Sequence, residues 1–285
     1  RRLFSANDTP VGSPAMSQIK LAKDVLWTRA NTLFKPNLKQ ANIALIGVPV
    51  HKSSITPNSC HLAPKAIRTA LSRYSTFAGS KEIDLRELKI TDLGDITGAD
   101  SAAGKKVIAK KVSGLLDKYE LLIALGGDNS ITYTVANGLF PDLSKVGLIT
   151  LDAHHDLRDG NSNGSPVWRL IQAGLAGKNI VQIGISDFAN SKEYSDRAKE
   201  YGITVITRDQ MRNKSMQDVM KIAFNSLNRS IEDIYVDIDV DVADRSVAPA
   251  CPASVPGGIS ADELRQAAFL LGKNYKVKAI DITEI

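Results

Sequence analysis

The chain has 285 residues, of which 43% are hydrophobic and 24% charged, a composition typical of a folded globular protein and not of a disordered one. Its net charge of +5 comes from lysines and arginines scattered among acids, which gives little support to nucleic-acid binding. No run approaches the roughly 20 apolar residues of a membrane helix, and two cysteines are too few for a disulfide framework, so we expect a cytoplasmic protein without a membrane partner.

Residues 1–15 are polar, rich in turn-forming residues and without periodicity, and we expect a disordered tail or an expression remnant there. Residues 16–285 contain no linker-like or low-complexity segment, which predicts a single domain. Apolar runs predict eight strands, at 43–48, 89–94, 121–126, 146–152, 180–185, 203–207, 234–241 and 277–283. Patterns with apolar residues three and four apart predict helices between many of them, for example at 63–75, 102–119 and 215–229.

Strands that are apolar on both faces and separated by helices predict a parallel sheet covered on both sides. Polar clusters follow three of these strands: GGDNS at 126–130, DAHHD at 152–156, and DIDVD at 237–241. Because ligands of such sheets bind beyond the carboxyl ends of the strands, we expect these clusters to meet at one rim.

The side chains of a strand alternate between its two faces. If the extended conformation persists through residue 156, the side chains of Asp152, His154 and Asp156 lie on one side and that of His155 on the other. The same alternation predicts that the side chains of Asp237, Asp239 and Asp241 lie on one side of the strand expected at 234–241. Carboxylate oxygens with one imidazole suit Mn²⁺ or another divalent first-row metal better than a structural zinc site.

Each of these features also has a simpler interpretation. A single Asp at a strand end often caps a helix, a DxDxD run can be a solvated acidic edge, and a lone His is often a hydrogen-bonded partner. Two such patterns, DxHxD and DxDxD, both at predicted carboxyl ends, favour a metal site, since carboxylates gathered without a cation would repel one another.

The motifs together resemble the arginase, agmatinase and formimidoylglutamase family of ureohydrolases. GGDNS, LDAHHD and DIDVDVADRSVAPACPASVPGG are similar to its three signature blocks, GVPVHKSSITPNSCHLAPKAIR to its first loop, and DITEI to its last strand. The resemblance runs from about residue 42 to the end, in the order of the family, and its details are nearest to the formimidoylglutamase branch.

The resemblance implies a three-layer αβα sandwich around an eight-stranded, mainly parallel sheet, and two Mn²⁺ ions, with Ni²⁺ as an alternative. The implied ligands are Asp152, His154, Asp239 and Asp241 for the second metal, and Asp156 and Asn129 with the bridging Asp152 and Asp239 for the first. Asp237 and His155 are reserve candidates. The resemblance also implies a homo-oligomer, a trimer or a hexamer.

Two residues depart from the family pattern. Asn129 stands where a histidine ligand is usual, so the amide oxygen ligates, or the first metal binds weakly, or only one metal is retained. Asn163 stands where arginases have a histidine proposed to relay protons. These departures keep open a catalytically silent homologue used for binding or assembly.

The implied reaction is the hydrolysis of a linear amidine or guanidino compound by metal-activated hydroxide, after which an amine or ammonia leaves. Asp156 would carry the proton, and Glu284 would pair with the cationic end of the substrate.

The first candidate substrate is N-formimidoyl-L-glutamate, because HHDLRD followed by NGSPV resembles the formimidoylglutamase branch, and Arg158 could bind the carboxylate of such a substrate. Asn163 and Ser165 are further candidates for substrate binding, and Arg158 could instead bind a structural carboxylate. Agmatine, arginine and other guanidino acids are the alternatives, and agmatine lacks a carboxylate.

Overall fold

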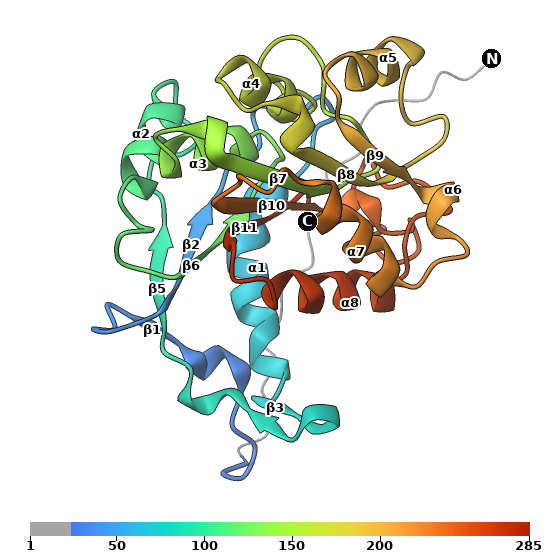
Figure 1. Cartoon of the computed structure of the whole chain (residues 1–285). Coiled ribbons are helices and arrows are strands. Elements are labelled where there is room, and N and C mark those ends of the chain that lie inside the picture. The colour runs from blue at the N-terminus through green and yellow to red at the C-terminus, as the bar shows by residue number, and fades with distance from the viewer. Residues whose placement is uncertain (1–23) are drawn as a thin grey trace, which may run out of the picture.

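The computed structural model describes residues 24–285 and arranges them in three layers, a central sheet with helices on both faces (Figure 1). The tail predicted at 1–15 lies outside the described residues. The sheet has nine strands in the order β1-β5-β2-β6-β11-β10-β7-β8-β9, and all neighbours are parallel. The strands are β1 (Phe34–Pro36), β2 (Ile43–Val48), β5 (Ile90–Asp95), β6 (Leu121–Gly126), β7 (Val146–Leu151), β8 (Ile180–Ile185), β9 (Thr204–Thr207), β10 (Asp233–Asp239) and β11 (Val277–Thr283).

All eight predicted strands occur, and the parallel sheet of an α/β sandwich is confirmed. The ninth strand, β1, is a three-residue edge strand beside β5 that the sequence analysis missed. Its short FKP sequence contains a proline and shows no alternation, which is why periodicity gave no signal for it. A short antiparallel hairpin, β3 (Phe77–Ala78) with β4 (Ile83–Asp84), lies outside the sheet.

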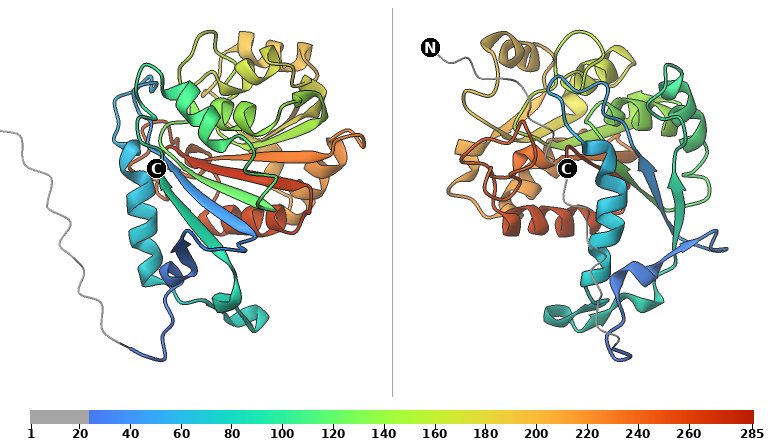
Figure 2. Two further views of the ribbon diagram at one scale, coloured as in Figure 1. Left: turned by 90° about the vertical axis from the view of Figure 1, so that its left-hand side faces the viewer. Right: turned by 180° about the vertical axis from the view of Figure 1, so that it is seen from behind.

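Two apolar cores hold the layers together, one on each face of the sheet. The first core packs the sheet against helices α2 to α4, and the second packs it against α7 and α8. Figure 2 shows helices on both faces of the sheet, seen from the side and from behind. The helices are α1 (Ala63–Ala70), α2 (Gly104–Val112), α3 (Ile131–Leu139), α4 (Pro166–Gln172), α5 (Lys192–Glu200), α6 (Arg208–Met211), α7 (Met216–Ser226) and α8 (Ala261–Gly272). Within residues 24–285, none of the helices has the length and apolarity that crossing a membrane requires.

Local sequence determines where several helices begin and end. Helix α8 begins at a capping box, in which the Ser260 hydroxyl accepts the Glu263 N–H and the Glu263 carboxylate accepts the Ser260 N–H. Helix α2 ends at Val112, before the predicted residue 119, because Gly114 takes a left-handed conformation with φ 71°.

The strand order places the carboxyl ends of β6, β11, β10 and β7 side by side at the centre of the sheet. Strands β6 and β7, which follow each other in the chain, are separated in the sheet by β10 and β11, so the chain crosses the sheet between them. A crevice beyond the carboxyl ends of the strands at such a crossing is the usual ligand site of an open parallel sheet.

Removing the Ile149 side chain tests the second core. Ile149 lies on β7 and is 0% exposed, so Ile149→Ala should lower the free energy of unfolding by about 2–5 kcal/mol, measured by urea titration. Ile222→Ala makes the same chemical change on the surface of α7, where the side chain is 39% exposed, and should cost much less. Equal losses in the two variants would contradict the packing described for this face.

Candidate active site

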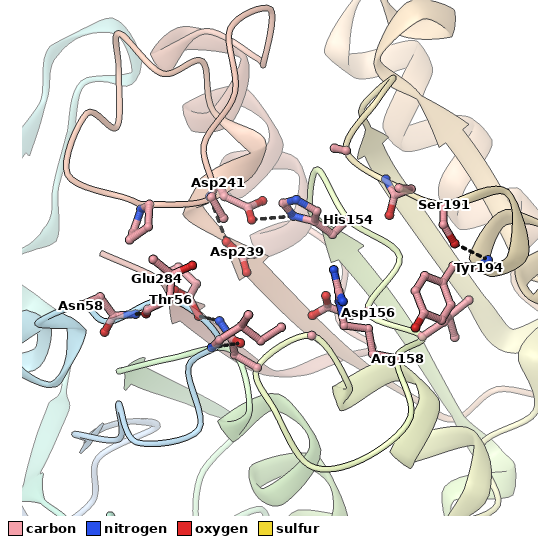
Figure 3. Close-up of a pocket in the computed structure, with 18 residues that line it drawn as sticks. Thr56, Asn58, His154, Asp156, Arg158, Ser191, Tyr194, Asp239, Asp241 and Glu284 are labelled. Atoms are coloured by element: carbon pink, nitrogen blue, oxygen red, sulfur yellow. Dashed lines mark hydrogen bonds and ion pairs between the residues drawn. The ribbon is translucent and has the colours of Figure 1, made fainter.

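The carboxyl ends of the central strands enclose a pocket of about 330 Å³, a volume that suits a small molecule (Figure 3). Its side chains come from segments far apart in the sequence. They include Thr56 and Asn58 before α1, His154, Asp156 and Arg158 after β7, Ser191 and Tyr194 at the start of α5, Asp239 and Asp241 at the end of β10, and Glu284 after β11. Acids, amides and one arginine thus face a common space.

Turns, and not the alternation of the strands, bring two of the acids into the pocket. Strand β7 ends at Leu151, and Asp156 has a left-handed backbone with φ 52°. Strand β10 ends at Asp239, and the next turn directs the Asp241 N–H to Asp239 Oδ1 at 2.9 Å. The predicted extension of both strands was therefore wrong, because each strand ends before its last acid.

Asp152, His154 and Asp241 form the densest cluster, with ligand atoms that all lie within 4.8 Å of one another. His154 Nδ1 is 2.8 Å from Asp241 Oδ2 and 3.5 Å from Asp152 Oδ1. Asp241 Oδ1 also accepts the N–H of Ala153 at 3.0 Å, which fixes the β10 turn to the β7 turn. Asp152 Oδ2 is buried and has no hydrogen-bond partner among the described residues, as expected of an oxygen that ligates a cation.

The charges of this cluster are unfavourable without a counter-ion. Burial and the neighbouring Asp241 raise the pKa of Asp152 to about 7. Burial, followed by the same neighbouring acids, raises the pKa values of Asp156 and Asp239 well above their usual range. Although burial opposes the charged form of His154, the carboxylates of Asp152 and Asp241 raise its pKa to about 11. A protonated imidazole thus supplies the positive charge that a metal ion would bring.

The residues present fit a divalent metal. Four buried carboxylates and one imidazole are donors that Mn²⁺ accepts, and one oxygen of Asp152 is buried without a hydrogen-bond partner among the described residues. The implied ligands Asp152, His154, Asp156, Asp239 and Asp241 are brought together at this site.

The side chain of Asn129 is oriented by hydrogen bonds and does not present its oxygen as a metal ligand would. Its amide oxygen accepts hydrogen bonds from the hydroxyls of Thr132 (2.8 Å) and Thr283 (3.0 Å), and its Nδ2 donates to Asp156 Oδ2 (2.7 Å). The side chain therefore presents a donor to the pocket acid and keeps its oxygen in the protein interior. Neither threonine was found from the sequence, because both lie outside the polar clusters.

Glu284 follows β11 with a left-handed backbone, φ 62°, and its side chain is buried beside the pocket. Its Oε1 accepts two hydrogen bonds, from the Asn129 N–H (2.8 Å) and from Asn163 Nδ2 (2.9 Å). Its Oε2 has no hydrogen-bond partner within residues 24–285. One oxygen of the carboxylate is thus fixed by the protein and the other is available to a ligand.

Arg158 lines the same pocket and is its single arginine. In the described part of the chain it has no acidic partner, and its guanidinium lies 5.8 Å from the centre of the Tyr194 ring. Gly164 allows this placement, since a Cβ there would come within 2.8 Å of Arg158 Cδ. Ser165 is fully buried beside Ser162 and is not among the residues that line the pocket.

Neither of the two reserve candidates belongs to the cluster of Asp152, His154 and Asp241 among the described residues. His155 is buried, with Nδ1 2.7 Å from Gln182 Oε1 and Nε2 3.2 Å from Ser195 Oγ. Asp237 lies within the sheet, in register with Asp281 of β11, and both side chains are 0% exposed. Burial, then the charge of Asp281, raises the pKa of Asp237 well above its usual range.

The rest of the lining was not anticipated from the sequence. Thr56 and Asn58 come from the loop before α1, and Ser191 and Tyr194 from the start of α5. Ser191 accepts the Tyr194 N–H as a helix cap, a role that its sequence context does signal. No local pattern indicates that this helix start faces the pocket, because that depends on how β8 and β7 pair.

Known proteins resemble the chain in sequence and in structure. A model of the arginase family matches residues 41–285. The formimidoylglutamase of Halalkalibacterium halodurans is 38% identical over 269 residues, which cover 90% of this chain and 84% of the relative. The solved formimidoylglutamase from Bacillus subtilis superposes with a TM-score of 0.83 at 30% identity, over 97% of this chain and 88% of that one. Formiminoglutamase of Trypanosoma cruzi with Mn²⁺ gives a TM-score of 0.81 at 25% identity, over 90% of each chain.

Adding and removing metal tests the charge balance of the site. We expect excess Mn²⁺ to raise the thermal midpoint of the chelator-treated protein, by an amount equivalent to about 2.7 kcal/mol when free Mn²⁺ is 100 times its Kd. In chelator, Asp239→Asn should be at least as stable as the unchanged protein, because it removes one of the repelling carboxylates and keeps an oxygen for the Asp241 N–H. With Mn²⁺ bound, the unchanged protein should be more stable than Asp239→Asn.

Scanning calorimetry with and without Mn²⁺ measures both effects. Asp209→Asn is the matched control, since the Asp209 side chain is 74% exposed, and it should change neither midpoint by much. The metal assignment fails if Mn²⁺ stabilises Asp239→Asn as much as it stabilises the unchanged chain.

Proposed function

We propose that this chain, which belongs to the arginase family, is a metal-dependent hydrolase of N-formimidoyl-L-glutamate. The observation that carries the proposal is a pocket with complementary charges on its two sides, the available Oε2 of Glu284 and the guanidinium of Arg158, which lacks an acidic partner in the described chain. The named formimidoylglutamase relatives, at 38% and 34% identity, support the same substrate.

The substrate combines an amidine with carboxylates in one small molecule. Its amidinium group is planar and carries N–H donors, which suits the free oxygen of Glu284. A carboxylate of its glutamate portion suits Arg158, whose planar guanidinium binds a carboxylate through two parallel hydrogen bonds. Agmatine has a cationic group but no carboxylate, so Arg158 gives it no partner.

Asp156 is the residue best placed to handle protons. Burial and then Asp152 raise its pKa well above the usual range, and Asn129 Nδ2 holds its Oδ2 at 2.7 Å. Water adds to the planar amidine carbon, and the proton it loses passes through the Asp156 carboxyl to a nitrogen. Cleavage of the bond to the glutamate nitrogen yields formamide and L-glutamate, whereas cleavage of the other C–N bond yields N-formylglutamate and ammonia.

Asp156 with Asp152 and Asp239 would hold the first cation. The second cation would be held by Asp152, His154, Asp239 and Asp241. Bound divalent cations lower the pKa of water and polarise the group under attack. Mn²⁺ is supported by the donor set and by the Mn²⁺ described in the Trypanosoma cruzi relative. We propose that Asn129 acts on Asp156 and is not itself a ligand, which leaves the first cation held by carboxylates alone among the residues named here.

Other assignments are less well supported. Arginine also combines a guanidinium with a carboxylate, and arginases are among the relatives, at 31% identity and below. A silent homologue is opposed by the five assembled ligand candidates. A homo-oligomeric state and a cytoplasmic location stay predictions of the sequence analysis.

A substrate panel tests the proposal. After loading with Mn²⁺, and separately with Ni²⁺, the protein is assayed with formimidoylglutamate, arginine, agmatine, guanidinobutyrate and guanidine. L-glutamate, formamide, urea and ammonia are all measured, so the assay identifies both the substrate and the bond that breaks. We expect turnover of formimidoylglutamate, abolished by Asp239→Ala. No turnover of any substrate with either metal would support the silent homologue.

Changing Arg158 tests the side of the pocket that would bind the carboxylate of the substrate. Arg158→Gln should lower kcat/KM for formimidoylglutamate by about ten- to a hundredfold, because one charge-assisted hydrogen-bonded pair is lost. Arg158→Lys should recover only part of the loss, since an ammonium cannot form the planar pair. Lys192→Gln, an exposed cation on nearby α5, should leave kcat/KM within about twofold. An unchanged KM in Arg158→Gln would reject this role.

A further inference from the structure

One side chain connects the substrate-facing acid to a loop that lines the pocket. Asn163 lies in the segment between β7 and α4. Its Oδ1 accepts the N–H of Ile55 at 3.0 Å, and its Nδ2 donates to Glu284 Oε1 at 2.9 Å. Ile55, Asn163 and Glu284 all belong to the pocket lining, although they are separated by more than a hundred residues of sequence.

The segment from 51 to 59, here called the covering loop, contributes Ile55, Thr56 and Asn58 to the pocket lining. Three hydrogen bonds attach it to the rest of the site. Ser54 Oγ bonds to Asp128 Oδ2 (3.2 Å), Ser53 O accepts the backbone N–H of Asn163 (3.0 Å), and the Ile55 N–H reaches the Asn163 side chain. The first two bonds do not depend on the side chain of residue 163.

Glu284 needs support because it is a buried carboxylate on a strained backbone. Its φ of 62° lies in the left-handed region, and its own N–H donates to Gly127 O at 2.9 Å. Burial raises its pKa, while the two N–H donors on Oε1 favour the charged form. With Oε1 fixed in this way, Oε2 keeps one direction toward the pocket, which saves the ordering cost when a planar amidinium binds.

We infer that Asn163 is a positioning residue that couples the placement of the covering loop to the orientation of Glu284. An amide carries an acceptor and a donor on opposite corners of one rigid plane, so the two bonds are formed together. A carboxylate could accept the Ile55 N–H but would repel Glu284, and an alanine would make neither bond. The inference rests on the proposed function, in which Glu284 pairs with the amidinium of the substrate.

Two variants separate the two halves of this coupling. Asn163→Asp keeps an acceptor for Ile55 and removes the donor to Glu284, whereas Asn163→Ala removes both. Asn161→Ala is the matched control, because Asn161 is an exposed asparagine two residues away that makes no hydrogen bond within the described residues. Bound Mn²⁺ and the thermal midpoint are measured in each variant to confirm that the fold and the metal cluster are intact.

Amide hydrogen exchange tests the attachment of the covering loop to Asn163, and it does not depend on enzymatic activity. The Ile55 amide should exchange at least tenfold faster in Asn163→Ala than in the unchanged chain, and at nearly the unchanged rate in Asn163→Asp. Asn161→Ala should not alter it. If the Ile55 amide is equally protected in Asn163→Ala, the inferred attachment of the loop is wrong.

Steady-state kinetics tests whether Asn163 orients Glu284. Both Asn163 variants should raise KM for formimidoylglutamate by about ten- to a hundredfold with a smaller change in kcat, because the amidinium is bound in the ground state as well as in the transition state. A residue that only held the loop would leave KM unchanged in Asn163→Asp, and that result would overturn the coupling. If the unchanged chain turns over no substrate, the proposed function fails, and the exchange experiment still decides the loop attachment.

Discussion

The constraint that governs this structure is the mutual repulsion of carboxylates buried at the carboxyl ends of the central parallel strands. Asp152, Asp156, Asp239 and Asp241 are all less than a tenth exposed, and burial with their neighbours' charges raises the pKa of three of them. Such a group is stable only if positive charge or N–H donors compensate it. His154 supplies the former, and the amides around the pocket supply the latter.

Two asparagines show how the chain uses this compensation. Asn129 directs its NH₂ at Asp156, and Asn163 directs its NH₂ at Glu284, so each neutral amide donates to one acid of the pocket. As the sequence analysis noted, Asn129 stands where the family usually has a histidine, and Asn163 where arginases have one. An imidazole at these places could ligate or exchange a proton, whereas an amide does not titrate and here donates a hydrogen bond that orients its partner. The departures are therefore compatible with an active site that depends more on geometry than on extra titrating groups.

Much of the fold and part of the site could be predicted from the sequence, because apolar runs and polar clusters are local signals. The eight longer strands and the meeting of their ends at one edge follow from those runs. The alternation argument failed at Asp156 and Asp241, since where a strand ends depends on hydrogen bonds that its own sequence does not specify. The orientation of Asn129 depends on Thr132 and Thr283, and the latter is 154 residues away, so no local pattern could indicate it.

The left-handed backbones of Asp156 and Glu284 have a consequence for how this protein can change. Such conformations cost on the order of 1–3 kcal/mol each in residues other than glycine, and glycine or asparagine would relieve the cost. Selection for thermal stability alone would therefore favour replacing two acids of the pocket. Heat resistance and activity are opposed at these positions, so a more robust descendant of this chain would have to gain its stability elsewhere in the sheet and its helices.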